Sequence, residues 1–155
     1  MADRDSLVDL TQALSRAGAV WSIDWRALSR CALALRVAPH AVPFEEASAD
    51  FILQEAQHLL ATAKEHGVVC TELQLDFDCA EKKLAGYRPL VERLRTAIQP
   101  MPLVITTLPV WLDEPEFPAL IAAADRYVLQ VHSVQPVKPG AQVAICDPER
   151  ARRSV

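Results

Sequence analysis

Apolar and polar residues alternate strictly over residues 73–78, Leu-Gln-Leu-Asp-Phe-Asp. A two-residue period of this kind is typical of a β-strand with one buried face. The apolar side chains would face a core, and the polar ones would share the opposite face. This polar set is Gln74, Asp76 and Asp78. The strand rise places the two carboxylates about 6.6–6.8 Å apart along the chain. A strand that only fills a core has no use for such a pair, so the pattern indicates a site.

The rest of the chain alternates between segments with the helical period and short apolar runs. Helical spacing predicts helices over residues 4–17, 24–28, 48–66, 87–98 and 115–124. Apolar or alternating runs predict strands over residues 31–37, 68–78, 102–108, 126–134 and 142–146. Gly67 is expected to end the longest helix, and Asp147-Pro148 has the composition of a further helix start.

This order of elements predicts an α/β fold with a parallel sheet and crossover helices. Two architectures fit the order, an open doubly wound sheet and a (β/α) barrel. A whole barrel usually needs about 250 residues, whereas this chain has 155. We therefore expect a single partial or shortened TIM-barrel-like domain over residues 1–155. Its open sheet edges favour a homodimer, or a segment missing from the chain.

In either architecture the site lies at the carboxyl ends of the parallel strands. Each of four predicted strands carries polar or aromatic groups at or just beyond that end. The candidates are Arg36, then Gln74, Asp76 and Asp78, then Thr106 and Trp111, then Gln130 and His132. We predict Asp78 and Asp76 as catalytic residues and the others as substrate-binding residues. Close carboxylates raise one another's pKa, which suits a general acid working near neutrality.

Structural roles remain open for the same residues. Arg36 could simply neutralise Asp76, and the two aspartates could form a salt bridge or cap a loop. His132 could be a core histidine. Trp111 could cap the core under a loop, or it could offer its flat face to a sugar ring.

Composition excludes several functional classes. Hydrophobic residues make up 51% of the chain and charged residues 23%, which is typical of a globular protein. The net charge is −4 and only the C-terminus has clustered arginines, so no nucleic-acid partner is expected. No apolar run reaches the about 20 residues that span a bilayer. The N-terminus lacks a signal-peptide pattern, and we expect a cytoplasmic protein.

Cofactor and nucleophile motifs are also missing from the sequence. It has no Gly-x-Ser-x-Gly elbow and no phosphate-binding glycine loop, so we predict no cofactor. The four cysteines, at positions 31, 70, 79 and 146, are far apart in sequence and form no Cys-x-x-Cys pair. We expect them to pack as small hydrophobic residues. A divalent metal bound by Asp76, Asp78 and His132 is an alternative with a weak signal.

Five stretches of the chain resemble an uncharacterised bacterial family of predicted TIM-barrel proteins, which is known as a domain of unknown function. They are residues 24–28, 71–79, 84–87, 105–112 and 127–133. The resemblance runs from about residue 20 to the end of the chain. It implies a barrel fold and no proven activity, and it includes members that look like exported lipoproteins. Family members are usually longer than this chain.

The acidic strand is distantly similar to the Asp-x-x-Asp-x-Asp-x-Glu motif of chitinase-like glycoside hydrolases. Asp78 falls where the catalytic glutamate of that motif stands, Asp76 on the assisting aspartate, and Gln74 on the innermost aspartate. The resemblance implies a protein that acts on or binds a carbohydrate. Because Asp78 is shorter than glutamate and Gln74 cannot ionise, a non-catalytic binding module is an alternative, as is a metal-dependent hydrolase.

Overall fold

The computed structural model describes residues 28–37, 46–131 and 152. Its centre is a sheet of four parallel strands in the order β1-β2-β3-β4. The strands are β1 (Arg30–Val37), β2 (Val69–Phe77), β3 (Leu103–Thr107) and β4 (Arg126–Leu129). Each strand therefore pairs with the next strand along the chain, as in the winding of a (β/α) barrel.

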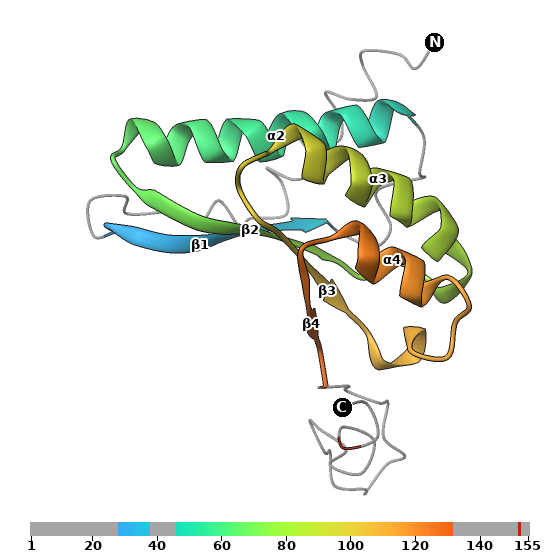
Figure 1. Cartoon of the computed structure of the whole chain (residues 1–155). Helices are drawn as coiled ribbons and strands as arrows, with labels where there is room; N and C mark the ends of the chain where they lie inside the picture. Colours follow the sequence, from blue (N-terminus) through green and yellow to red (C-terminus); the bar gives the residue numbers. More distant parts are fainter. Residues whose placement is uncertain (1–27, 38–45, 132–151, 153–155) are drawn as a thin grey trace, which may run out of the picture.

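The helices connect the strands and gather on one face of the sheet (Figure 1). They are α2 (Glu46–Glu65), α3 (Leu84–Ala97) and α4 (Phe117–Ala123), with short 3₁₀ turns η2 (Glu81–Lys83) and η3 (Pro109–Trp111). Parallel crossovers are right-handed, so a chain that always steps to the same side puts every helix on the same face. We call the other side of the sheet the opposite face; no helix of the described ranges covers it.

The core lies between the sheet and the three helices. In β2 the alternation read from the sequence is observed directly, since Leu73, Leu75 and Phe77 are buried while the residues between them are partly exposed. Helix α3 contributes its own buried stripe at helical spacing. This stripe consists of Leu84, Tyr87, Leu90, Val91 and Leu94. Together with apolar residues of β1, β3, α2 and α4, these residues of β2 and α3 form one hydrophobic core, whose burial stabilises the fold.

The end of α2 has the hydrogen bonds of a Schellman motif. The amide of Val68 donates to the carbonyl of Ala63 at 2.9 Å, and the amide of Gly67 donates to that of Lys64 at 3.0 Å. Gly67 has φ of 73°, which glycine adopts without steric cost. The predicted helix end at Gly67 is therefore confirmed, and it turns the chain directly into β2.

The α/β class, the parallel sheet and the crossover helices are confirmed. Element limits move by a few residues. Strand β4 ends at Leu129, and residues 132–134 of the strand predicted over 126–134 lie outside the described residues. The helix predicted over residues 4–17, nearly all of that over 24–28, the strand over 142–146 and the helix start at Asp147 lie outside the described residues. No helix in the ranges that the structure describes is long and apolar enough to cross a bilayer.

A polar contact fastens α3 to the amino end of the sheet. Asp125 accepts hydrogen bonds from the backbone amide of Leu103 at 2.9 Å and from Arg95 Nε and Nη2 at 3.0 and 2.6 Å. The backbone hydrogen bond from Leu103 and the bonds from Arg95 hold the pKa of Asp125 below its ordinary value. The ionised carboxylate thus links β3, α3 and the start of β4.

Truncation of Leu73 tests the buried face of β2. Leu73→Ala should lower the free energy of unfolding by about 2–5 kcal/mol, because a fully buried side chain leaves a cavity. Val69→Ala, at an exposed position of the same strand, should change it by less than about 0.5 kcal/mol. Urea denaturation followed by circular dichroism measures both, and equal effects would contradict the assignment of the buried face.

Replacement of Asp125 tests the contact that fastens α3. Asp125→Asn should lower the free energy of unfolding by about 1 kcal/mol near neutral pH, because a charge-assisted contact is lost. The folded-state pKa is depressed, so the contribution is complete above the unfolded-state pKa and disappears as the pH falls through the folded-state pKa. Urea midpoints of the two proteins should therefore converge below about pH 4, and a constant difference from pH 7 to 3 would contradict this role.

Candidate functional site

Asp76 is the centre of a row of polar side chains at the carboxyl ends of the four strands. We call Arg36, Asp76, Thr106 and Gln130 the polar row. Its Oδ2 accepts a hydrogen bond from Arg36 Nη1 at 2.6 Å. Its Oδ1 accepts from Thr106 Oγ1 at 2.8 Å and from Gln130 Nε2 at 3.1 Å. Arg36 belongs to β1, Thr106 belongs to β3, and Gln130 directly follows β4. The carboxylate of Asp76 in β2 therefore connects side chains from all four strand ends.

Strand register explains why these residues meet. Arg36 is the registered partner of Asp76 across β1 and β2. Val104 pairs with Gln74, so Thr106, two residues further on, comes level with Asp76. Thr106 in turn pairs with Val128, and Gln130 follows Val128 by two residues on the same face. The amide of Gln130 donates to the carbonyl of Thr107 at 2.8 Å, which continues the ladder beyond β4.

Asp78 lies beside the row, immediately beyond the end of β2. Its Oδ2 accepts a hydrogen bond from Arg36 Nη2 at 3.2 Å, so one guanidinium contacts both carboxylates. The positive charge offsets the repulsion between the two aspartates. The Asp78 side chain is 29% exposed and that of Asp76 is 16% exposed. Asp76 is thus the anchored member of the pair, and Asp78 is the member with more room to meet a ligand.

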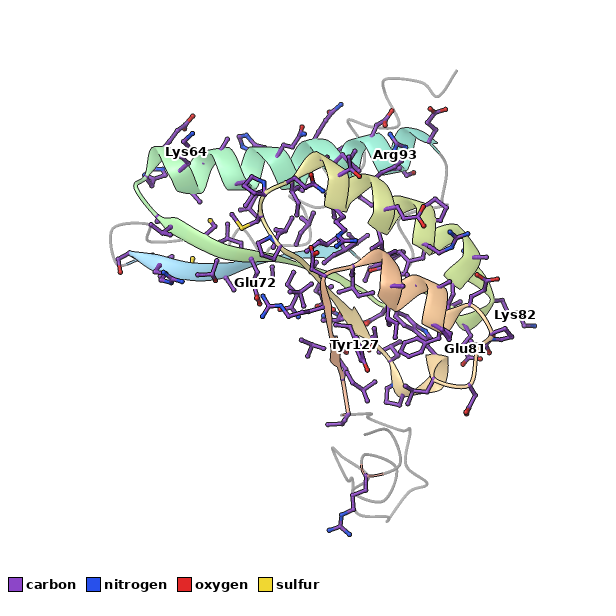
Figure 2. The ribbon with its side chains drawn as sticks, in the orientation of Figure 1. Lys64, Glu72, Glu81, Lys82, Arg93 and Tyr127 are labelled. Carbon is purple, nitrogen blue, oxygen red and sulfur yellow. The ribbon has the colours of Figure 1, made fainter. Side chains whose placement is uncertain are left out.

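Further polar residues follow the opposite face toward the amino ends of the strands. Gln74 is partly exposed two residues before Asp76. Glu72 accepts a hydrogen bond from Arg126 Nη2 at 2.6 Å. Figure 2 shows Glu72 on the side of the sheet away from α2, which carries the labelled Lys64. Strand β2 is therefore polar on the opposite face from Glu72 to Asp78, whereas its residues under the helices are apolar from Leu73 to Phe77.

The structure does not bring Trp111 to this row. Its side chain is fully buried, and its ring packs edge-on against Tyr87 with centroids 6.2 Å apart. Tyr87 makes a similar contact with Phe77 at 5.3 Å. Burial of a large aromatic side chain contributes more stabilising free energy than burial of a small one, and Trp111 is buried in the core. This placement corresponds to the core-capping role considered for Trp111, which offers no exposed indole face to a sugar.

Cys79 and Tyr87 lie close to the carboxylates without belonging to the polar row. Cys79 is buried, and this burial raises the pKa of its thiol to about 12. The expected packing role of Cys79 fits this state, since a neutral thiol is a poor nucleophile. Burial also raises the pKa of Tyr87 well above its usual range, and the nearby charges of Asp76 and Asp78 add to this effect. Sequence reasoning gave Tyr87 no part in the site and placed it only at the start of the helix predicted over residues 87–98.

His132 lies outside the described residues, so its predicted substrate-binding role stays a prediction. Within the described ranges, no group of three or more histidine, cysteine or acidic side chains could hold a metal ion. The guanidinium of Arg36 contacts both Asp76 and Asp78 and would compete with a metal for the same oxygens. A metal site that uses His132 as its third ligand stays a prediction.

Two pockets open at the other end of the strands. One, of about 520 Å³, has Arg95, Pro100, Asp125 and Arg126 in its lining. The other, of about 320 Å³, lies against Leu60, Cys70 and Met101 and is largely apolar. In parallel α/β sheets ligands bind at the carboxyl ends of the strands. The polar row around Asp76 is therefore the better candidate site.

A family model matches residues 43–155 and is described as Domain of unknown function (DUF3142). The chain belongs to this family. Most of the sheet, the connecting helices and the polar row apart from Arg36 fall within the match. Searches of curated proteins and of solved structures find no match.

Family membership confirms one part of the expected resemblance, the domain of unknown function. The distant similarity to chitinase-like glycoside hydrolases has no support from these comparisons and stays a prediction. For this DUF3142 domain, function must be argued from the site itself.

Removal of the negative charge of Asp76 should weaken the hydrogen bonds of the polar row and destabilise the fold. Asp76→Asn should lower the free energy of unfolding by about 1–3 kcal/mol, because Arg36 and the row's neutral donors lose an anionic acceptor. The matched control is Asp50→Asn, which breaks an exposed ion pair with Arg93 between two helices. The control should cost less than about 1 kcal/mol. Thermal and urea unfolding compare the two variants, and an equal loss would contradict a central role for Asp76.

Proposed function

We propose that this DUF3142 domain binds a carbohydrate at the carboxyl ends of its strands, in the manner of a glycoside-hydrolase-like protein. Asp78 would make the principal contact with the ligand. Arg36, Gln74 and Gln130 would supply further hydrogen bonds to sugar hydroxyl groups. The observation that carries this proposal is the difference between the two acids: among the described residues, Asp76 is held by three side-chain donors and Asp78 by one.

The chemistry of the row suits a ligand rich in hydroxyl groups. Carboxylate oxygens accept hydrogen bonds, whereas guanidinium and amide nitrogens donate them. A sugar hydroxyl does both, so it can bridge an acceptor such as Asp78 and a donor such as Arg36. Because the fixed contacts of Asp76 hold Arg36 in position before a ligand arrives, less side-chain freedom is lost on binding.

Binding is better supported than hydrolysis by the contacts of Asp78. A general acid must carry a proton when the glycosidic bond breaks. Asp78 Oδ2 instead accepts a hydrogen bond from Arg36 Nη2 at 3.2 Å, so this oxygen faces a hydrogen-bond donor. Hydrolysis with Asp78 as general acid is the second candidate function. It is favoured by the position of this partly exposed carboxylate just beyond a parallel strand, where barrel enzymes place catalytic groups.

Titration with soluble chito- and cello-oligosaccharides tests the proposal. Wild-type protein should bind at least one of them, as followed by calorimetry or by amide shifts in NMR spectra. Asp78→Asn should weaken that binding by about tenfold or more, equal to a loss of about 1.4 kcal/mol. Asp50→Asn should leave the affinity unchanged, because Asp50 pairs with Arg93 among the helices.

The same oligosaccharides separate binding from hydrolysis. Release of shorter sugars by the wild type, abolished in a folded Asp78→Asn variant, would establish the second candidate. Binding without any release of products would establish a binding module. The absence of both binding and turnover across a broad glycan panel would overturn the carbohydrate proposal.

A further inference from the structure

Two cysteines that are far apart in sequence lie directly opposite each other in the sheet. Cys31 of β1 and Cys70 of β2 are registered partners at the amino ends of the two strands. Both are free thiols. The interaction of Cys70 with Cys31 contributes to the raised pKa of Cys70, after the larger effect of its burial. The fold thus brings Cys31 and Cys70 together, although no local sequence motif predicts this pair.

Both thiols belong to the same side of the sheet. Cys31 and Cys70 each pack against the hydrophobic core, and each is only partly buried. Cys79, by contrast, is buried. A small reagent can therefore reach the pair at positions 31 and 70 from the amino edge of the sheet, whereas Cys79 is shielded.

The spacing of neighbouring strands suits a disulfide. Hydrogen-bonded strands lie about 4.7–4.9 Å apart, and disulfides join residues whose Cα atoms are about 4.4–6.8 Å apart. The ladder is irregular between Cys31 and Leu33, where β2 contains an extra residue. Strands bend and twist more freely at such a bulge, which gives the two side chains room to adjust.

We propose that Cys31 and Cys70 form a reversible cross-strand disulfide when the protein meets a low-molecular-weight disulfide such as oxidised glutathione. The thiolate of one cysteine attacks the glutathione disulfide, breaks its sulfur–sulfur bond and releases one glutathione thiolate. The second cysteine then attacks the mixed disulfide, forms the Cys31–Cys70 bond and releases the other glutathione. The protein loses two electrons and two protons, and both are recovered in two glutathione thiols.

The crosslink would attach β1 covalently to β2. Among the described strands, β1 pairs only with β2, and it carries Arg36 to the polar row. Joining residues 31 and 70 closes a long loop that contains α2, and a closed loop restricts the unfolded chain. The oxidised protein should therefore resist unfolding better than the reduced one. This inference is independent of the carbohydrate proposal.

Oxidation of the folded chain with oxidised glutathione, followed by alkylation and peptide mapping, tests the pair. A peptide with Cys31 should be joined to a peptide with Cys70, and the bond should disappear after treatment with a thiol reductant. The crosslink should form at least about tenfold faster in the folded chain than in the urea-unfolded chain, because the strands hold the thiols together. The urea midpoint of the folded protein should rise on oxidation.

Variants identify the cysteines that are required. Cys31→Ser and Cys70→Ser should each abolish the internal disulfide and the rise in the urea midpoint, and circular dichroism checks that each variant folds. Cys79→Ala and Cys146→Ser should retain both effects. Alkylation of both cysteines after oxidation would overturn the proposal, as would glutathione adducts that persist without any Cys31–Cys70 bond, or a bond to Cys79 or Cys146. Mapping of the wild type decides the matter even where a variant does not fold. An unchanged or lowered midpoint in the crosslinked protein would overturn its stabilising role.

Discussion

The parallel register of the four strands is the constraint on which the rest of this structure depends. Parallel strands all end at the same edge of the sheet, so a polar residue near the end of one strand lies level with those of its neighbours. Asp76 uses this arrangement to accept hydrogen bonds from Arg36, Thr106 and Gln130. If one strand moved by a single residue, the side chains of that strand would change faces and the row would be lost.

The same winding separates the chemistry of the two faces. Because each crossover steps to the next strand in the same direction, α2, α3 and α4 all cover one face and bury its apolar residues (Figure 1). The polar partners of the alternating pattern then collect on the opposite face. In β2 the acids of the site and the residues of the hydrophobic core are therefore two consequences of one two-residue period.

Within the row, the guanidinium of Arg36 changes how the acid pair is understood. Two carboxylates on one strand face would repel each other if no cation lay between them. Here the guanidinium of Arg36 contacts both Asp76 and Asp78, and the Arg36 side chain remains 64% exposed. This arrangement resembles a preformed binding site with a charged acceptor and a charged donor more than it resembles a poised general acid. This contact is the reason why we rank carbohydrate binding as the first candidate function and hydrolysis as the second.

The sequence by itself determined the parts of the structure that depend on local periodicity. Alternation in residues 73–78 fixed which side chains of β2 are buried, the helical spacing located α2 and α3, and Gly67 marked the end of α2. It also placed Arg36, Asp76, Thr106 and Gln130 at strand ends, because parallel strands have a common functional edge. Only the tertiary structure decided which of these residues touch, since hydrogen bonds between strands depend on register and register has no local signature. It likewise decided that Trp111 belongs to the core and that Cys31 lies opposite Cys70, because both facts arise from contacts between residues far apart along the chain.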